Sequence, residues 1–269
     1  MSQPPDNYVH GHHESVLRSH SVRTIDNSAA YLVPHLEPGR SLLDVGCGPG
    51  TITVEFAQRL APGNVVGIDA ASEVVGKAAA LVEETSLENC TVQTGDTYAL
   101  DFADDTFDIV HAHQVLQHVR DPVAALREMR RVARPGGVVA VRDADYGGFT
   151  WAPPDPTLDQ WLDIYHQITA SNEVEANAGR YLLGWVHEAG FTEVTMTAST
   201  WVYATPEQRA WWGGLWADRA RQSTYATEAT SLGLADAADL EAIAEAFRKW
   251  STQASGVFFI PHGEIIAIA

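Results

Sequence analysis

The run Leu-Leu-Asp-Val-Gly-Cys-Gly-Pro-Gly at residues 42–50 constrains the fold most strongly. It predicts an apolar strand that ends in an acid and a glycine loop, followed by a helix over residues 51–60. Glycines let the backbone come close to a ligand, and the loop offers the first amides of the helix to an anionic group. The nicotinamide fingerprint G-x-G-x-x-G would need a glycine at position 51, which is Thr51. The spacing therefore favours a different nucleotide-like cofactor.

Strand and helix patterns alternate from residue 41 onward, which predicts an α/β fold with a doubly wound, mostly parallel seven-stranded sheet. The expected strands cover residues 41–45, 65–69, 91–95, 107–113, 138–142, 192–203 and 257–268. The expected helices cover residues 25–36, 51–60, 72–84, 122–132, 158–170, 179–189, 206–221 and 237–252.

The chain divides into three predicted regions. Residues 1–40 form an N-terminal lid or helical segment, residues 41–145 form the cofactor-binding core, and residues 146–269 complete the sheet and add extra C-terminal lid helices. All eight tryptophans lie after residue 145. Most of these rings are expected in the core, but such a one-sided cluster suggests that some of them line an apolar substrate pocket.

Two acids follow the second and third predicted strands. Asp69 lies about 20 residues past the glycines, where doubly wound folds place an acid that binds ribose hydroxyls. Asp96 ends the third strand, where a carboxylate can accept a hydrogen bond from an adenine amine. The glycine loop and both acids fall at the carboxyl ends of adjacent strands, which is where open α/β sheets bind ligands.

Two further segments extend this pattern. Residues 105–119 contain the fourth strand with His111, His113, Gln114 and His118, and residues 134–137 (Arg-Pro-Gly-Gly) form the turn before the fifth strand. Together with the loop and the acids, they resemble the motifs of class I S-adenosylmethionine (SAM) methyltransferases across residues 40–142. Within that superfamily, the chain most resembles the ubiquinone/menaquinone C-methyltransferase-like branch.

The resemblance implies a Rossmann-like methyltransferase fold with SAM as cofactor. It implies that the glycines approach the methionine part, Asp69 the ribose and Asp96 the adenine, and that His113 lies beside the sulfur that carries the methyl group. The full cofactor-binding prediction is Asp44, Gly46, Cys47, Gly48, Gly50, Asp69, Ala70, Asp96, Thr97 and His113.

The expected reaction is methyl transfer to an oxygen, carbon or nitrogen of a small, partly apolar molecule. A base is needed when the acceptor must lose a proton, and His113 at the end of the fourth strand is the predicted catalytic residue, either as base or as orienting group. The predicted substrate-binding residues are His12, Gln114, Asp145, Tyr146 and Trp212. A SAM-binding enzyme without methyl transfer, such as a cyclase, and a non-enzymatic SAM-binding module are the alternatives.

Composition and charge exclude some classes of binding partner. The net charge of −18 disfavours nucleic acid, because phosphate contacts need clustered Lys and Arg. No apolar run reaches the length of about 20 residues that spans a membrane, and no secretory signal is seen at the start. Cys47 and Cys90 provide neither a zinc spacing nor a disulfide framework. A cytoplasmic protein without a metal is expected, and its oligomeric state is left open.

Overall fold

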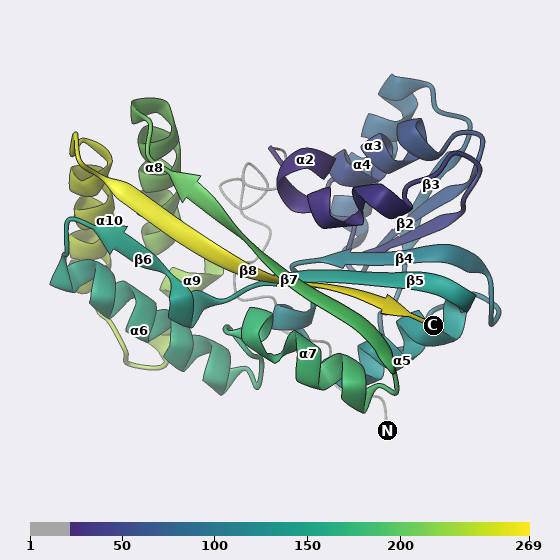
Figure 1. Cartoon of the computed structure of the whole chain (residues 1–269). Helices are drawn as coiled ribbons and strands as arrows, with labels where there is room; N and C mark the ends of the chain where they lie inside the picture. The colour runs from purple at the N-terminus through teal and green to yellow at the C-terminus, as the bar shows by residue number, and fades with distance from the viewer. Residues whose placement is uncertain (1–21) are drawn as a thin grey trace. The chain divides into compact units, whose positions relative to one another are not determined.

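The computed structural model describes residues 22–269, and the chain there forms two compact units (Figure 1). The sheet unit comprises residues 22–144, 178–199 and 262–269. The helical unit comprises residues 145–177 and 200–261. Within the described residues, no helix has the length and apolar character needed to cross a membrane.

The sheet unit contains the predicted parallel sheet. Its strands lie in the order β3-β2-β1-β4-β5-β8, and β7 also pairs with β8. The pairs β1–β2, β2–β3, β1–β4 and β4–β5 are parallel, whereas β5 and β8 are antiparallel. The strands are β1 (Leu42–Val45), β2 (Val65–Asp69), β3 (Cys90–Thr94), β4 (Phe107–His113), β5 (Ala133–Ala144), β7 (Glu193–Tyr203) and β8 (Val257–Ile268).

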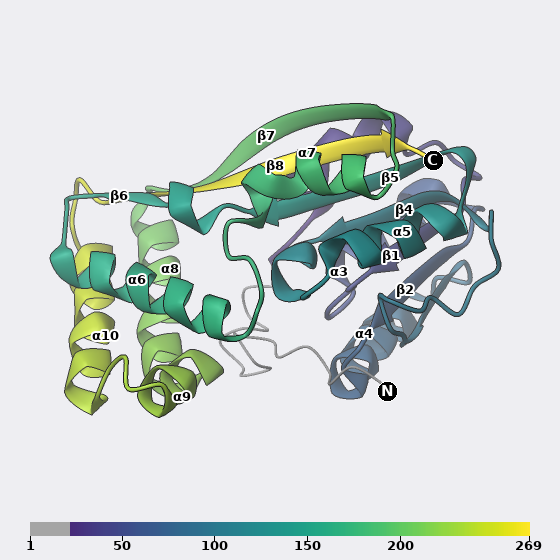
Figure 2. The same ribbon diagram turned by 90° about the horizontal axis from the view of Figure 1, so that it is seen from below.

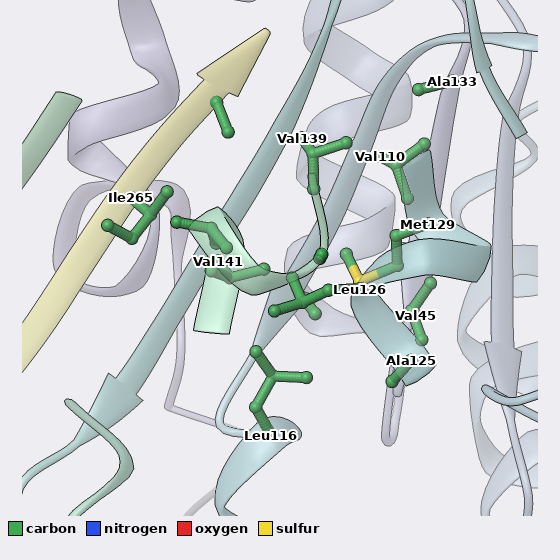
Figure 3. Close-up of a cluster of buried hydrophobic side chains, with 14 of the residues drawn as sticks. Val45, Val110, Leu116, Ala125, Leu126, Met129, Ala133, Val139, Val141 and Ile265 are labelled. Carbon is green, nitrogen blue, oxygen red and sulfur yellow. The ribbon is translucent and has the colours of Figure 1, made fainter. Parts of the chain in front are cut away.

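The two faces of this sheet carry separate apolar cores, because neighbouring residues of a strand point to opposite faces. Leu42 packs with the core on the side of α3, whereas Leu43 packs with the core on the side of α5. Figure 1 shows α3 and α4 on one side of the sheet and α5 and α7 on the other. Figure 3 shows the second core, where Leu126 and Met129 of α5 lie against the strands. The helices are α2 (Ile25–Ser28), α3 (Thr51–Leu60), α4 (Ser72–Thr85), α5 (Pro122–Val132) and α7 (Ala178–Glu188), with the 3₁₀ turns η1 (Ala30–His35) and η2 (Leu116–His118).

The helical unit is built around aromatic side chains. Trp161 and Trp216 are fully buried, and their ring centroids are 4.5 Å apart in an edge-to-face arrangement. Its helices α8 and α10 lie side by side (Figure 2). Its elements are η3 (Tyr146–Gly148), β6 (Thr150–Ala152), α6 (Pro156–Ser171), α8 (Pro206–Gln222), α9 (Thr224–Ser231) and α10 (Ala237–Ser251), and β6 pairs with the first residues of β8.

Four details of the predicted fold are wrong. Residues 134–137, expected to form a turn before the fifth strand, lie within β5, which begins at Ala133. The described residues form eight strands rather than seven, because the three-residue strand β6 is too short to show a period. Helix α9 was missed. The single helix expected over residues 25–36 is divided into α2 and η1 at Ala29, whose φ of −139° is not helical. Pro34, which lacks the N–H that a continuous α-helix would need, lies inside η1.

Candidate SAM-binding and acceptor site

The glycine loop after β1 depends on left-handed backbone angles. Gly46, Gly48 and Gly50 have φ values of 70°, 57° and 84°. A Cβ at Gly46 would lie 2.4 Å from Cγ2 of Val115, so this position has no space for a side chain. Gly50 is the N-cap of α3, and no side chain caps that helix. The loop therefore presents backbone amides at the start of a ten-residue helix, as a bound anionic group would require.

Asp44, on β1 just before the loop, is held by hydrogen bonds to both neighbouring elements. The hydroxyl of Thr53 donates a 2.6 Å hydrogen bond to Oδ2 of Asp44, and Nδ1 of His111 lies 2.8 Å from Oδ1. All three residues are buried. Because Thr53 belongs to α3 and His111 to β4, the carboxylate joins β1 to both neighbouring elements.

Asp69 connects the loop to the end of β2. Its Oδ2 accepts a 3.1 Å hydrogen bond from the Gly48 N–H, and its Oδ1 accepts a 3.0 Å bond from the Ala71 N–H. Asp69 is half-buried and Ala70 is exposed. The carboxylate thus lies next to the glycine loop and remains within reach of solvent or a ligand.

Asp96 and Thr97 follow β3. Asp96 is exposed, and its Oδ1 accepts a 2.8 Å hydrogen bond from the Tyr98 N–H. The Thr97 hydroxyl is buried and has no hydrogen-bond partner within residues 22–269. A buried hydroxyl without a partner is costly, so a ligand atom that bonds to it would be favoured.

Cys47 contributes its backbone to the loop. Its N–H donates a 2.9 Å hydrogen bond to the Ile68 carbonyl, and its side chain is buried. Burial, and then the nearby Asp44 charge, raise the pKa of the Cys47 thiol far above its usual range. The thiol is therefore protonated at neutral pH, which makes it a poor nucleophile.

His113 is the last residue of β4, as its position in the sequence predicts, and its side chain is buried. Burial, followed by the positive charges of Arg23 and Arg142, lowers the pKa of His113 well below 6.5. His118, in η2, also has its pKa lowered, to about 3, chiefly by burial. Both imidazoles are neutral at pH 7.

Sequence reasoning missed two residues beside His113. His262, on β8, stacks on His113 with ring centroids 6.3 Å apart and planes 24° apart. Arg23, just before α2, donates a hydrogen bond to the side-chain oxygen of Gln114. His111 and His113 share a face of β4 by strand periodicity, but no local pattern shows that His262 joins them.

The other predicted substrate residues do not belong to this unit. Asp145 is half-buried at the start of the helical unit, and its N–H donates to the Pro261 carbonyl. Tyr146 is buried and stacked on Tyr165, with ring centroids 4.1 Å apart. Trp212 is buried and stacked on Tyr203 at 4.6 Å. His12 lies outside the described residues.

The sheet unit thus brings together the glycine loop, the acids after β2 and β3, and His113. The loop backbone, the half-buried Asp69 and exposed Asp96 carboxylates and the buried Thr97 hydroxyl fit a cofactor with an anionic end, a ribose and a base. Within residues 22–269, no three His, Cys, Asp or Glu side chains are arranged to hold a metal ion. Fold and site define a Rossmann-like protein that binds a nucleoside cofactor.

Comparison with known proteins identifies the family within this class. A family model described as a methyltransferase domain matches residues 36–208, so the chain belongs to that methyltransferase family. It is 35% identical to an uncharacterized methyltransferase, C1B3.06c, of Schizosaccharomyces pombe, over 99% of this chain and 98% of the relative. It is also 37% identical to the ubiquinone/menaquinone biosynthesis C-methyltransferase of Bdellovibrio bacteriovorus, over 38% of this chain and 43% of the relative.

Solved structures agree on the fold. Phosphoethanolamine N-methyltransferase 2 of Haemonchus contortus, in complex with SAM, is similar with a TM-score of 0.56 at 16% identity. The similarity covers 89% of this chain and 51% of that chain. The chain is a SAM-dependent methyltransferase related to the ubiquinone/menaquinone branch, and the predicted enzyme class and cofactor are confirmed.

Proposed function

We propose that this methyltransferase acts on a small, partly apolar molecule and not on nucleic acid. The net charge of −18 opposes binding to a phosphate backbone. The helical unit is rich in aromatic side chains, and small-molecule sites are lined mainly by apolar and aromatic residues. Cys47 and Cys90 are both free, which fits a reducing compartment such as the cytoplasm.

The cofactor would be held by the sheet unit. The backbone of the loop at Gly46, Cys47 and Gly48 would lie against its methionine part, Asp69 and Ala70 would lie at its ribose, and Asp96 and Thr97 at its adenine. Gly50 would let α3 begin close to the ligand, and Asp44 would act through Thr53 and His111 rather than by contact. When bound, SAM supplies a methyl carbon on a sulfonium that an acceptor atom attacks in line.

The acceptor side would begin at His113. Because its pKa lies well below 6.5, its imidazole is neutral but only weakly basic, which favours an orienting role over proton removal. A neutral imidazole can hold an acceptor hydroxyl or carbonyl by one hydrogen bond. Holding both reactants in near-attack geometry can contribute roughly 7–11 kcal/mol, so a strong base is not essential. Gln114 would contact the acceptor beside His113. The other proposed substrate contacts are His12, Asp145, Tyr146 and Trp212.

The observation that carries this proposal is the Asp69 bridge, which fixes an acid against the Gly48 amide at the loop. Titration calorimetry with SAM and with S-adenosylhomocysteine tests it. Asp69→Ala should weaken both ligands by about tenfold or more, because a charge-assisted hydrogen bond contributes roughly 1.5–3 kcal/mol. Asp101→Asn, at an exposed position, is the matched control and should bind as the wild type does.

A screen of small acceptors with a labelled SAM methyl group tests the acceptor class. Label should enter small apolar molecules and not RNA or DNA. Equal affinity of wild type and Asp69→Ala would contradict the ribose assignment. Label in nucleic acid alone would contradict the acceptor class.

A further inference from the structure

The backbone of Gln114 adopts an unusual conformation at the point where β4 ends. Its φ is 54°, in the left-handed region that residues other than glycine rarely occupy. Its N–H donates a 2.7 Å hydrogen bond to the carbonyl of Arg142 on β5. Such a conformation persists where the surroundings determine it, and it is common at functional sites.

The side chain of Gln114 is held at both ends. Nη2 of Arg23 donates to its Oε1, and its Nε2 lies 2.9 Å from Nε2 of His262. All three residues belong to the sheet unit. The two contacts, together with the backbone bond, leave the amide one orientation.

The direction of these hydrogen bonds follows from the donors available. An arginine has donors and no acceptor, so the amide oxygen must face Arg23 and the amide NH₂ must face His262. Nε2 of His262 must then accept, which requires a lone pair. His262 is therefore neutral, with its proton on Nδ1.

This neutral ring is buried and stacks on His113. Among residues 22–269, the charged and titratable groups that act on His113 include Arg23, Arg142, His111 and His262. A proton on Nε2 of His262 would break its bond with the amide NH₂. Turning the amide around would then point its NH₂ at the donors of Arg23.

We propose that Arg23, Gln114 and His262 form a hydrogen-bond relay that fixes the Nδ1–H tautomer of His262 and thereby positions His113 and Gln114 toward the methyl acceptor. Arg23 and His262 are positioning residues in this relay. The part of the relay that concerns the acceptor rests on the proposed role of His113, whereas the tautomer of His262 does not.

Long-range proton–nitrogen correlation NMR on the uniformly ¹⁵N-labelled protein tests the relay without any acceptor. His262 is assigned by the loss of its signals in His262→Asn. We expect a pyrrole-type shift at Nδ1 and a pyridine-type shift at Nε2 in the wild type. In Gln114→Glu the new carboxylate can only accept, so Nε2 of His262 should become pyrrole-type.

Two further variants separate the relay from general damage. Arg23→Gln keeps a polar side chain but replaces a group that can only donate with an amide that can also accept. The Gln114 amide can then turn either way, so His262 should show a mixture of both tautomers. This variant tests the relay if Gln114→Glu does not fold. Gln117→Glu is the matched control, because Gln117 pairs with Nε2 of His118 at 3.0 Å and should leave His262 unchanged.

Kinetics with an acceptor from the labelled screen completes the test. Gln114→Glu should lower kcat about tenfold or more while the affinity for S-adenosylhomocysteine changes by less than about threefold. A pyrrole-type Nε2 in wild-type His262, or unchanged kcat in Gln114→Glu with a reversed tautomer, would overturn the relay. Failure of methyl transfer to every small acceptor would instead overturn the proposed function and leave the tautomer result intact.

Discussion

Asp143, near the end of β5, is a buried acid whose charge the fold opposes. Its side chain has no exposed surface, and its Oδ1 accepts a 3.1 Å hydrogen bond from the Gln117 N–H. Its Oδ2 is buried without a hydrogen-bond partner in the part of the chain that the structure describes. Burial raises the pKa of Asp143 from 3.8 to about 7, against the opposing effects of that hydrogen bond and of Arg142.

The sign of the pH effect follows from linkage. Between pH 3.8 and about 7 the folded chain keeps the Asp143 proton that the unfolded chain has lost, so this residue makes stability fall as pH rises. A shift of about three pKa units at about 1.4 kcal/mol each corresponds to about 4 kcal/mol in total. Of this, about 3 kcal/mol lies between pH 5 and 8.

Asp143→Asn imitates the protonated acid and removes this loss. Its free energy of unfolding should exceed that of the wild type by about 3 kcal/mol more at pH 8 than at pH 5. Urea unfolding followed by circular dichroism at both pH values measures the difference, and taking it between variants cancels the contributions of the histidines. Asp101→Asn, at an exposed position, should show no such change. A difference between Asp143→Asn and wild type that is the same at both pH values would refute the reasoning.

Two further predictions concern the site. In Gly46→Ala the residue would keep a left-handed φ and its new Cβ would lie 2.4 Å from Val115, so the free energy of unfolding should fall by about 2–4 kcal/mol. In Gly39→Ala, where φ is 90° and the space is open, it should fall by about 1–2 kcal/mol. Urea unfolding compares the two variants, and equal losses of stability would contradict the clash at Gly46. His113→Ala should lower kcat about 10- to 100-fold, the effect of losing one buried orienting hydrogen bond of about 1–3 kcal/mol. Because the pKa of His113 lies well below 6.5, the wild-type rate should show no His113 ionisation between pH 6 and 8; a rate that rises with pH through 6.5 and loses this dependence in His113→Ala would identify a base instead.

The candidate cofactor side of the site can be proposed from the sequence because its signals are local. The glycine loop and the acids at positions 69 and 96 each follow a strand whose pattern is visible within a few residues. Parallel strands then bring their carboxyl ends to one edge, so no long-range information was needed to group them. The bond between Asp69 and the Gly48 amide is the observed form of that grouping.

The short strand β6 was not predicted because its signal is not local. Three residues of β6 cannot establish a period of two, and their pairing with β8 depends on residues more than 100 positions away. The division of the first helix did have a local signal in Pro34. The prediction of one helix rested on the apolar spacing of Ala29, Leu32, Val33 and Leu36. Ala29, Leu32 and Leu36 are buried in one core, and Val33 is partly buried against it.

The acceptor side shows how far strand periodicity extends. His111 and His113 lie two residues apart on β4, and His262 and Glu264 lie two residues apart on β8, so each pair could be assigned to one face of its strand. What joins the pairs is register: Arg142 lies opposite His113 on one side and Glu264 on the other. Arg142 then donates a 3.1 Å hydrogen bond to the buried Glu264 carboxylate, which offsets its charge. The same face carries His113 and His262, whose ring centroids lie 6.3 Å apart. Long-range strand pairing, which no local pattern shows, therefore places His262 beside the proposed acceptor site.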